Sequence, residues 1–278
     1  MDIGHGVSKS YEPRTYRELL RARDLAFFNC TVKETDLQIG VALSSLRPEL
    51  LGCESTGLGS AHTGLQGLQG LEGMRAEAIA AVHESRGEIE RYIPTHHEFL
   101  TSLVPVTPKP WAPPVVQLMC TASARAGVGP MAAVAGAIAD FVGARLRLYS
   151  SEVIVENGGD IFIASSGPRK VGIYAGSSPL SQKVAIEVSP GPRGCGVCTS
   201  SGTVGHSKSF GRADAAVIIA RDAALADAVA TAVGNAVQSE KDVERAARSV
   251  SRVRGVTGAV VIAGAAMGAW GDVKLVQF

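Results

Sequence analysis

Hydrophobic and polar positions alternate with two different periods along the chain, and these periods separate expected helices from expected strands. Apolar residues at helical spacing between charged ones predict an amphipathic helix over residues 74–93. Residues 129–146 are apolar or small on nearly every side, which predicts a buried helix in which Gly136 allows close packing. Residues 223–237 are Ala, Val or Leu at almost every position and predict a second buried helix. A charged helix is expected over 240–253.

Short β-branched runs mark the expected strands, and polar turns join most of them. Residues 151–165 hold two such runs around an Asn-Gly-Gly-Asp turn, and Asn-Gly indicates a hairpin because both central residues can take positive φ. Further strands are expected at the runs VGIYAG, KVAIEVS, AAVIIA, AVVIAG and DVKLVQF. Hairpins dominate this order. The pattern therefore predicts an α+β fold, with antiparallel sheets and helices packed on them, in a single domain over residues 1–278.

One stretch departs from both periods. Residues 55–73 contain GLQGLQGLEG, in which glycine recurs every third residue. Glycine lowers helix stability because it loses more backbone freedom on folding than any other residue. We therefore predict a flexible, Gly-rich insertion here rather than a helix.

Composition narrows the kinds of partner. The chain has 27 Lys and Arg against 26 Asp and Glu, a formal charge of +1, so nothing in the balance favours nucleic acid or an anionic membrane. The N-terminus has no signal-peptide pattern, and the longest apolar run is shorter than the roughly 20 residues of a membrane helix. We expect a cytoplasmic protein, and oligomers are possible. Its five cysteines are expected as thiols, with zinc at CGVC a minor alternative.

Three polar residues interrupt the apolar helix 223–237. Asp227, Thr231 and Asn235 are spaced four residues apart and therefore share one stripe of its surface. In a structural interpretation, Asp227 meets an Arg or backbone amides, and Thr231 bonds back to the carbonyl of residue 227. In a functional one, Asp227 and Thr231 offer oxygen ligands to Mg²⁺, whose shell is completed by water and a substrate phosphate.

A hydroxyl-rich stretch, CTSSGTVGHSKSFGRADA, lies between two apolar runs. Hydroxyls, backbone amides and turn-forming glycines can build a concavity that holds an anion, here from Thr199, Ser200, Ser201, Gly202 and Thr203. His206 follows them. It is either a solvated surface histidine or an acid/base group, since its pKa is easily tuned to neutral pH.

The turn in ENGGDIF is a further candidate. Gly158, Gly159 and Asp160 are explained equally well as an ordinary hairpin turn and as a place where a planar ligand approaches the backbone.

Taken together, ENGGDIF, CTSSGTVGHS and AALADAVATAV resemble the ApbE superfamily, whose best-known members are FAD-dependent flavin transferases. In that family a GGD turn, a TSG loop followed by a histidine, and a helix of the form ADALATAL line one cleft. The resemblance implies Mg²⁺ on Asp227 and Thr231. It also implies FAD or another flavin near the GGD turn and the hydroxyl loop.

Six stretches in order, TYRELL, KETDLQI, HHEF, AGVGPMAAVAGAIAD, VENGGDIF and CTSSGTVGHSKSFGRADA, are similar to a soluble ApbE-like branch found in anaerobes. That similarity implies an association with homocysteine formation from sulfide and an aspartate-derived aldehyde. The lysine, tyrosine and proline usual in the transferase motifs are missing here. The leading hypothesis is therefore an enzyme or enzyme subunit of sulfur or cofactor metabolism with a small anionic ligand and possible protein partners of the same pathway.

Two other functions stay open, a true flavin transferase and a non-catalytic flavin or nucleotide carrier. In the leading hypothesis His206 is the acid/base group. Cys198 is either a thiol or persulfide carrier or a small buried residue.

Overall fold

A computed structural model describes residues 22, 24–47, 62–191, 193–203 and 210–278 of the chain. The larger of its two sheets has eight strands, and every neighbouring pair is antiparallel. In spatial order they are β1 (Ala26–Val32), β2 (Thr35–Val41), β3 (Val153–Asn157), β4 (Asp160–Ala164), β7 (Cys195–Ser200), β8 (Ala215–Ala220), β9 (Val256–Ala263) and β10 (Ala266–Gly271). The smaller sheet has the order β11 (Lys274–Gln277), β6 (Val184–Val188), β5 (Arg169–Gly172).

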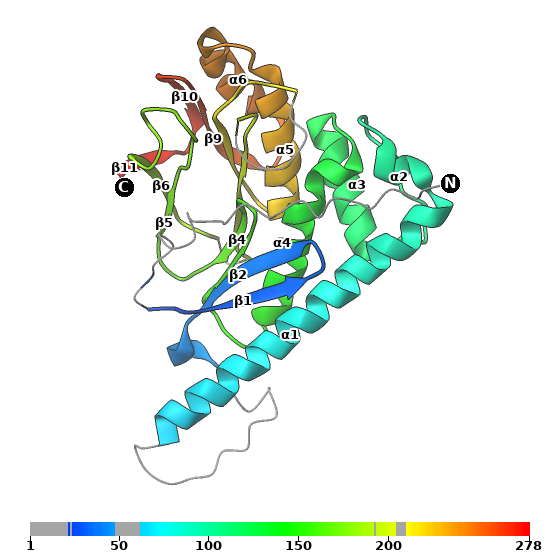
Figure 1. The fold of residues 1–278 in the computed structure, drawn as a ribbon, viewed down its shortest axis with the longest axis vertical. Helices are drawn as coiled ribbons and strands as arrows, with labels where there is room; N and C mark the ends of the chain where they lie inside the picture. Colours follow the sequence, from blue (N-terminus) through cyan, green and yellow to red (C-terminus); the bar gives the residue numbers. More distant parts are fainter. Residues whose placement is uncertain (1–21, 23, 48–61, 192, 204–209) are drawn as a thin grey trace, which may run out of the picture.

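Helices cover one face of the large sheet, and the small sheet covers the other (Figure 1). The α-helices are α1 (His62–Tyr92), α2 (His97–Thr101), α3 (Pro114–Ala126), α4 (Val134–Leu146), α5 (Ala223–Ala236) and α6 (Val243–Ser249). Short 3₁₀ turns are η2 (Leu43–Ser45), η4 (Ile93–Thr95), η5 (Pro130–Ala133), η6 (Glu240–Asp242) and η7 (Val250–Arg252). The arrangement confirms the predicted α+β class.

The alternation of side chains along each strand explains the two apolar layers. In β8, Ile218 belongs to the core under the helices, whereas Val217 and Ile219 belong to the core between the sheets. Because both faces are buried, this strand is a continuous apolar run. A third apolar cluster joins α1, α3, η5 and α5 outside the first layer of helices.

The predicted hairpin at residues 151–165 is confirmed as β3 and β4, which pair with Asn157 opposite Asp160. The predicted buried helices are also present, although the first begins with the 3₁₀ turn η5. The charged segment 240–253 is not one helix but η6, α6 and η7 in succession. A capping box between Ser239 and Asp242 fixes its start.

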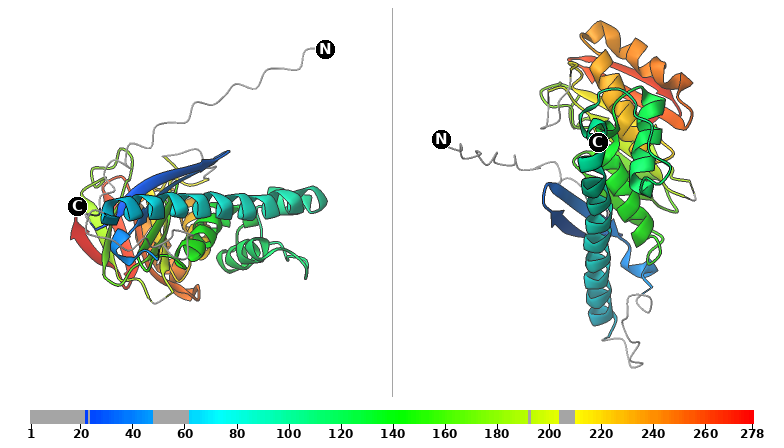
Figure 2. Two further views of the ribbon diagram at one scale, coloured as in Figure 1. Left: turned by 90° about the horizontal axis from the view of Figure 1, so that it is seen from below. Right: turned by 90° about the vertical axis from the view of Figure 1, so that its right-hand side faces the viewer.

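The prediction of a flexible stretch at residues 55–73 is wrong from residue 62 onward, because α1 begins at His62 and includes the glycine repeat. Figures 1 and 2 show α1 as a long rod along the side of the molecule. Leu, Gln and Glu between the glycines favour helix. Packing adds to this, since Met74 is fully buried and Gly70 faces Leu46. Residues 55–61 lie outside the described ranges.

No single described helix has the length and apolar character needed to cross a membrane. Only the bent pair of Pro114–Ala126 with Pro130–Leu146 meets those two criteria jointly.

Candidate functional site

The hydroxyl-rich stretch begins as a strand, not as a loop, so its side chains point to alternate faces of the large sheet. Cys198 lies opposite Asp160 of β4 and belongs to the core under the helices. Ser200, two residues further, shares that helix-facing side. Thr199 shares the opposite face with Val197, which is in the core between the sheets. Within the predicted anion-holding set, the Thr199 and Ser200 side chains therefore lie on opposite faces of β7.

The GGD turn is held against β7 by backbone bonds. Gly158 and Gly159 have φ values of 69° and 101°, which explains the two glycines. The Gly159 amide donates to Glu156 Oε1 at 2.8 Å, and the Gly159 carbonyl accepts from the Thr199 amide at 3.1 Å. Asn157 Nδ2 donates to the Ala135 carbonyl at 3.0 Å, so the turn also touches the first turn of α4.

Asp227 projects from α5 to the start of α4. Its Oδ2 accepts from the Gly136 amide at 3.0 Å, and the Ala135 amide is a second donor. This confirms the structural interpretation in which backbone amides meet the carboxylate, at the positive end of a helix. Burial raises the pKa of Asp227 well above its ordinary value, and the two amides only partly oppose this. None of the described Lys and Arg residues forms an ion pair with it.

Thr231 lies one turn beyond Asp227 on α5. Within the ranges that the structure describes, its hydroxyl has no hydrogen-bond partner, so the predicted bond to the carbonyl of residue 227 does not form. Ser200 approaches the same stripe, since a Cβ added at Gly234 would lie 3.4 Å from Ser200 Oγ. The Ser200 hydroxyl likewise has no partner in the described chain. Asp160, Ser200, Asp227 and Thr231 are hereafter the polar cluster.

Two carboxylates of the polar cluster act on the same buried thiol. Asp160 and Asp227 lie near enough to Cys198 to raise the pKa of its thiol. Cys198 itself is fully buried, and its thiol donates to the Ala223 carbonyl at 3.3 Å. Since desolvation is the main cause of a pKa well above the ordinary value, the reactive thiolate is suppressed. Of the two interpretations of Cys198, a thiol carrier and a small buried residue, its burial therefore favours the second.

The two cysteines of CGVC cannot share a zinc ion. Cys195 belongs to the core between the sheets, and Cys198 belongs to the core under the helices. Residues three apart in a strand point to opposite faces.

The remaining hydroxyl residues form a turn whose groups are committed to the protein. Thr203 Oγ1 donates to Asp214 Oδ1 at 2.9 Å, and the Thr203 amide donates to Ser201 Oγ at 3.1 Å. The Gly202 amide donates to the Ala213 carbonyl at 2.8 Å. His206 lies outside the described residues, so its predicted acid/base role stays a prediction.

Asp140 of α4 is a residue that the sequence reasoning missed. Its Oδ1 and Oδ2 accept from the amides of Ala223 and Ala224, both at 2.9 Å, at the start of α5. Burial raises its pKa to about 7. The available signal was the same as for Asp227, namely a lone carboxylate within an otherwise apolar helix.

The described residues contain no group of three His, Cys, Asp or Glu side chains that could hold a metal ion. A cation beside Asp227 would therefore use the Thr231 hydroxyl, water and oxygens of a ligand. The chemistry of this donor set fits Mg²⁺, which retains waters and binds one or two carboxylates plus phosphate. A buried carboxylate without an ion pair is also an environment in which a cation is favoured.

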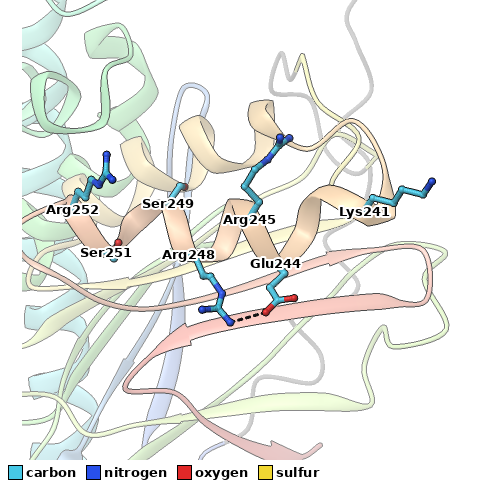
Figure 3. Close-up of a pocket in the computed structure, with 7 residues that line it drawn as sticks. All are labelled: Lys241, Glu244, Arg245, Arg248, Ser249, Ser251 and Arg252. Atoms are coloured by element: carbon cyan, nitrogen blue, oxygen red, sulfur yellow. Dashed lines mark hydrogen bonds and ion pairs between the residues drawn. The ribbon is translucent and has the colours of Figure 1, made fainter.

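A separate polar depression lies on the exposed side of α6 and its flanking turns (Figure 3). Arg248 pairs there with Glu244 at 2.7 Å, and Arg245 pairs with Asp242. It shares no residue with the polar cluster. Its arginines are largely exposed, as expected of a solvated helix face.

Comparison with known proteins gives the family. Residues 60–263 match the family model described as AbpE bacteria. The chain is 48% identical over 202 residues to a UPF0280 protein of Methanothrix thermoacetophila, covering 72% of this chain and 84% of that one. A UPF0280 protein of Methanosphaerula palustris is 46% identical over 194 residues, covering 69% and 80%.

Among solved structures, the flavin transferase ApbE from Vibrio cholerae aligns with 12% identity and a TM-score of 0.48, over 88% of this chain and 96% of that one. The family model spans well over half of the chain, and the UPF0280 relatives are covered over most of their length. The chain therefore belongs to the AbpE bacteria family and has the UPF0280 proteins as relatives.

Proposed function

We propose that this protein is an FAD-dependent flavin transferase that uses a divalent cation at the polar cluster. The observation that supports this proposal is that Asp227 and Thr231 lie one turn apart on α5, the helix on which Ser200 packs at Gly234. The start of α4, whose Gly136 amide binds Asp227, also binds Asn157 next to the GGD turn. The hydroxyls of Thr231 and Ser200 have no partner within the described residues, so both are available to a ligand or to its cation. Membership of the family, together with the ApbE-like motifs, supports flavin chemistry over other nucleotide chemistry.

In this proposal Asp227 and Thr231 would hold Mg²⁺, and Ser200 would bind a phosphate oxygen. When bound, the cation would stabilise negative charge on the phosphates of FAD. A serine or threonine hydroxyl of an acceptor protein attacks the phosphorus of the FMN half. The bond between the two phosphates breaks, AMP leaves, and the hydroxyl proton passes to a base, for which His206 is the candidate. The FMN remains attached to the acceptor as a phosphodiester.

The protein's own groups prepare this reaction in two ways. The amides of Ala135 and Gly136 hold one side of the Asp227 carboxylate, which limits its rotation. The double-glycine turn removes side-chain bulk next to β7, where a planar ring could approach the backbone.

The test uses the full chain with FAD and Mg²⁺, first without an acceptor. Water can replace the acceptor hydroxyl, so slow release of AMP and FMN is expected and is measured by chromatography. With candidate acceptor proteins added, a fluorescent band on a denaturing gel shows covalent flavin. Asp227→Asn should abolish both signals. A wild-type protein that neither releases AMP nor is thermally stabilised by FAD with Mg²⁺ contradicts the proposal.

The experiment also separates the other functions. A ligand at 100 times its Kd adds about 2.7 kcal/mol to the free energy of unfolding. Such stabilisation without AMP release favours a non-catalytic flavin or nucleotide carrier. The association with homocysteine formation and sulfur metabolism, which came from the resemblance to the soluble branch, has no support among the described residues. Cys198, the candidate sulfur carrier, is fully buried there. A cytoplasmic location remains part of the proposal.

A further inference from the structure

Helices α4 and α5 bind each other's first backbone amides through a pair of carboxylates. Asp140, in the middle of α4, accepts from the Ala223 and Ala224 amides at the start of α5. Asp227, in α5, accepts from the Gly136 amide at the start of α4. Because each helix supplies the carboxylate that the other needs, we call Asp140 and Asp227 the reciprocal clamp.

The two helix backbones are in direct contact at the clamp. A Cβ added at Gly136 would lie 2.2 Å from the Ala223 carbonyl oxygen and 2.9 Å from the Ala224 amide nitrogen. Such a contact leaves no side chain between the helices that could adjust their spacing. The hydrogen bonds of the clamp therefore define how α5 lies on α4.

Within the described residues, no other side chain joins either helix start to the neighbouring helix. The N-cap position of α4 is Ala133, which has no side-chain acceptor. The start of α5 has its own cap in Asp222, whose Oδ1 accepts from the Leu225 amide at 2.8 Å. That bond stays within one segment and does not touch α4. Asp140 is thus the group that connects the α5 start to the neighbouring helix.

The position of α5 matters because Asp227 and Thr231 follow Ala224 by one and two turns. The other side of the polar cluster is fixed to α4, since Asn157 of the GGD turn binds the Ala135 carbonyl. A shift of α5 along α4 would therefore change the distance between the proposed cation ligands and the turn. Groups that orient metal ligands in this way typically change metal affinity about 10- to 100-fold when they are removed.

We propose that Asp140 is a positioning residue, which holds Asp227 and Thr231 in register with the GGD turn by fixing the start of α5 on α4. This inference rests on the proposed function for the identity of the cation. Asp140 itself does not contact that cation. Its effect is transmitted through the α5 backbone and through the opposite end of the clamp.

The test compares Asp140→Asn and Asp140→Ala with Asp222→Asn, which weakens a cap on the same helix start without touching α4. Two quantities are measured on the full chain without FAD. The first is Mn²⁺ affinity, followed by electron paramagnetic resonance. The second is hydrogen exchange of the Ala135 and Gly136 amides, which bind Asp227 and not Asp140. If Asp140→Ala does not fold, Asp140→Asn, which keeps the side-chain shape, decides the outcome.

We expect both Asp140 variants to weaken Mn²⁺ binding about tenfold or more and to speed exchange at Ala135 and Gly136, while Asp222→Asn leaves both near wild type. Equal effects of Asp140→Asn and Asp222→Asn at comparable loss of stability overturn the inference. If the wild type does not bind Mn²⁺, the cation site of the proposed function fails, and Asp140 has no role there. Unchanged exchange at Ala135 and Gly136 overturns the coupling across the clamp in either case.

Discussion

Ser200 and Thr199 show how the direction of a single side chain decides which hydroxyls can serve a ligand. Both are at the end of β7, and both have hydroxyls without a partner in the described chain. Ser200 points toward α5 and lies against Gly234. Thr199 lies on the face of β7 that is turned toward the small sheet, which is opposite to the face next to Asp227. Chemically similar neighbours are therefore expected to behave differently.

Thr231→Val and Ser200→Ala should weaken Mg²⁺-dependent FAD binding, whereas Thr199→Val should not. Thr231→Val keeps the side-chain shape and removes a hydroxyl with no described partner, so the melting temperature should stay near wild type. We expect a loss of affinity of about tenfold, close to one good hydrogen bond. Isothermal titration calorimetry measures this. A Thr199→Val effect as large as that of Thr231→Val would place the ligand on the other face of β7.

Asp140 makes stability depend on pH in the direction opposite to a typical carboxylate. Burial raises its pKa from 3.8 to about 7, so the folded state binds a proton more tightly than the unfolded state. Its contribution is fully present below its unfolded pKa of 3.8 and is lost as pH rises through about 7. For one proton, the free energy of unfolding can change by at most about 1.4 kcal/mol per pH unit.

In urea unfolding with a chelator present, the wild type should therefore lose stability between about pH 5 and about pH 8 more steeply than Asp140→Asn. Asp227, whose pKa is also raised by burial, should still make the stability of the variant fall somewhat as the pH rises. The difference between the two curves is the measurement. Parallel curves would show that Asp140 is already ionised throughout this range.

At the scale of the element, two helical glycines are expected to respond to alanine with opposite signs. A Cβ added at Gly67 in α1 meets no atom within 4 Å, so Gly67→Ala should stabilise the protein by about 0.5–1 kcal/mol. At Gly136 the added Cβ would collide with the α5 backbone. Gly136→Ala should cost about 1–3 kcal/mol through strain. Denaturant unfolding of both variants gives the two values, and no gain at Gly67 would contradict a helix that includes the glycine repeat.

The sequence could predict elements whose local signals agree with their packing. The hairpin at Asn157 needed only an Asn-Gly turn between β-branched runs, and the Asp227 stripe needed only helical spacing. The start of α1 could not be predicted in this way, because its glycines oppose helix, while contacts with distant residues such as Leu46 favour it.

The candidate site also has features that local sequence patterns reveal and features that depend on distant contacts. Asp227 and Thr231 share a stripe that spacing alone reveals. The partner of Asp227 could not be found from spacing, since it is the backbone of Gly136, 91 positions away. Asp140 was missed for the same reason, as its role depends on amides of another helix. Thr199 lies in a strand rather than a loop because β7 pairs with β4 and β8, and no local pattern in the sequence encodes that pairing.

For the whole molecule, the small sheet is joined to the large one by an apolar layer and by an ionic network that is partly buried. Arg169 of β5 binds Glu152, just before β3, at 2.7 Å and Asp24, just before β1, with two bonds of 2.9 and 2.7 Å. Ser165 and Ser166 also donate to Glu152. Burial alone would raise the pKa of Glu152, but these hydrogen bonds lower it from 4.5 to about 2.

Arg169→Ala should destabilise the protein by about 1.5–3 kcal/mol near neutral pH, because it removes charge-assisted bonds to a mostly buried carboxylate. The Asp24 bonds add little, since that side chain is largely exposed. Glu152 has a lowered pKa, so its stabilising effect is present above 4.5 and is lost as pH falls toward about 2. The gap between wild type and Arg169→Ala should therefore narrow in acid. Lys170→Ala, on the exposed neighbour, is the control and should stay close to wild type. A gap that stays constant down to about pH 2 would mean that Arg169 acts by packing between the sheets rather than through Glu152.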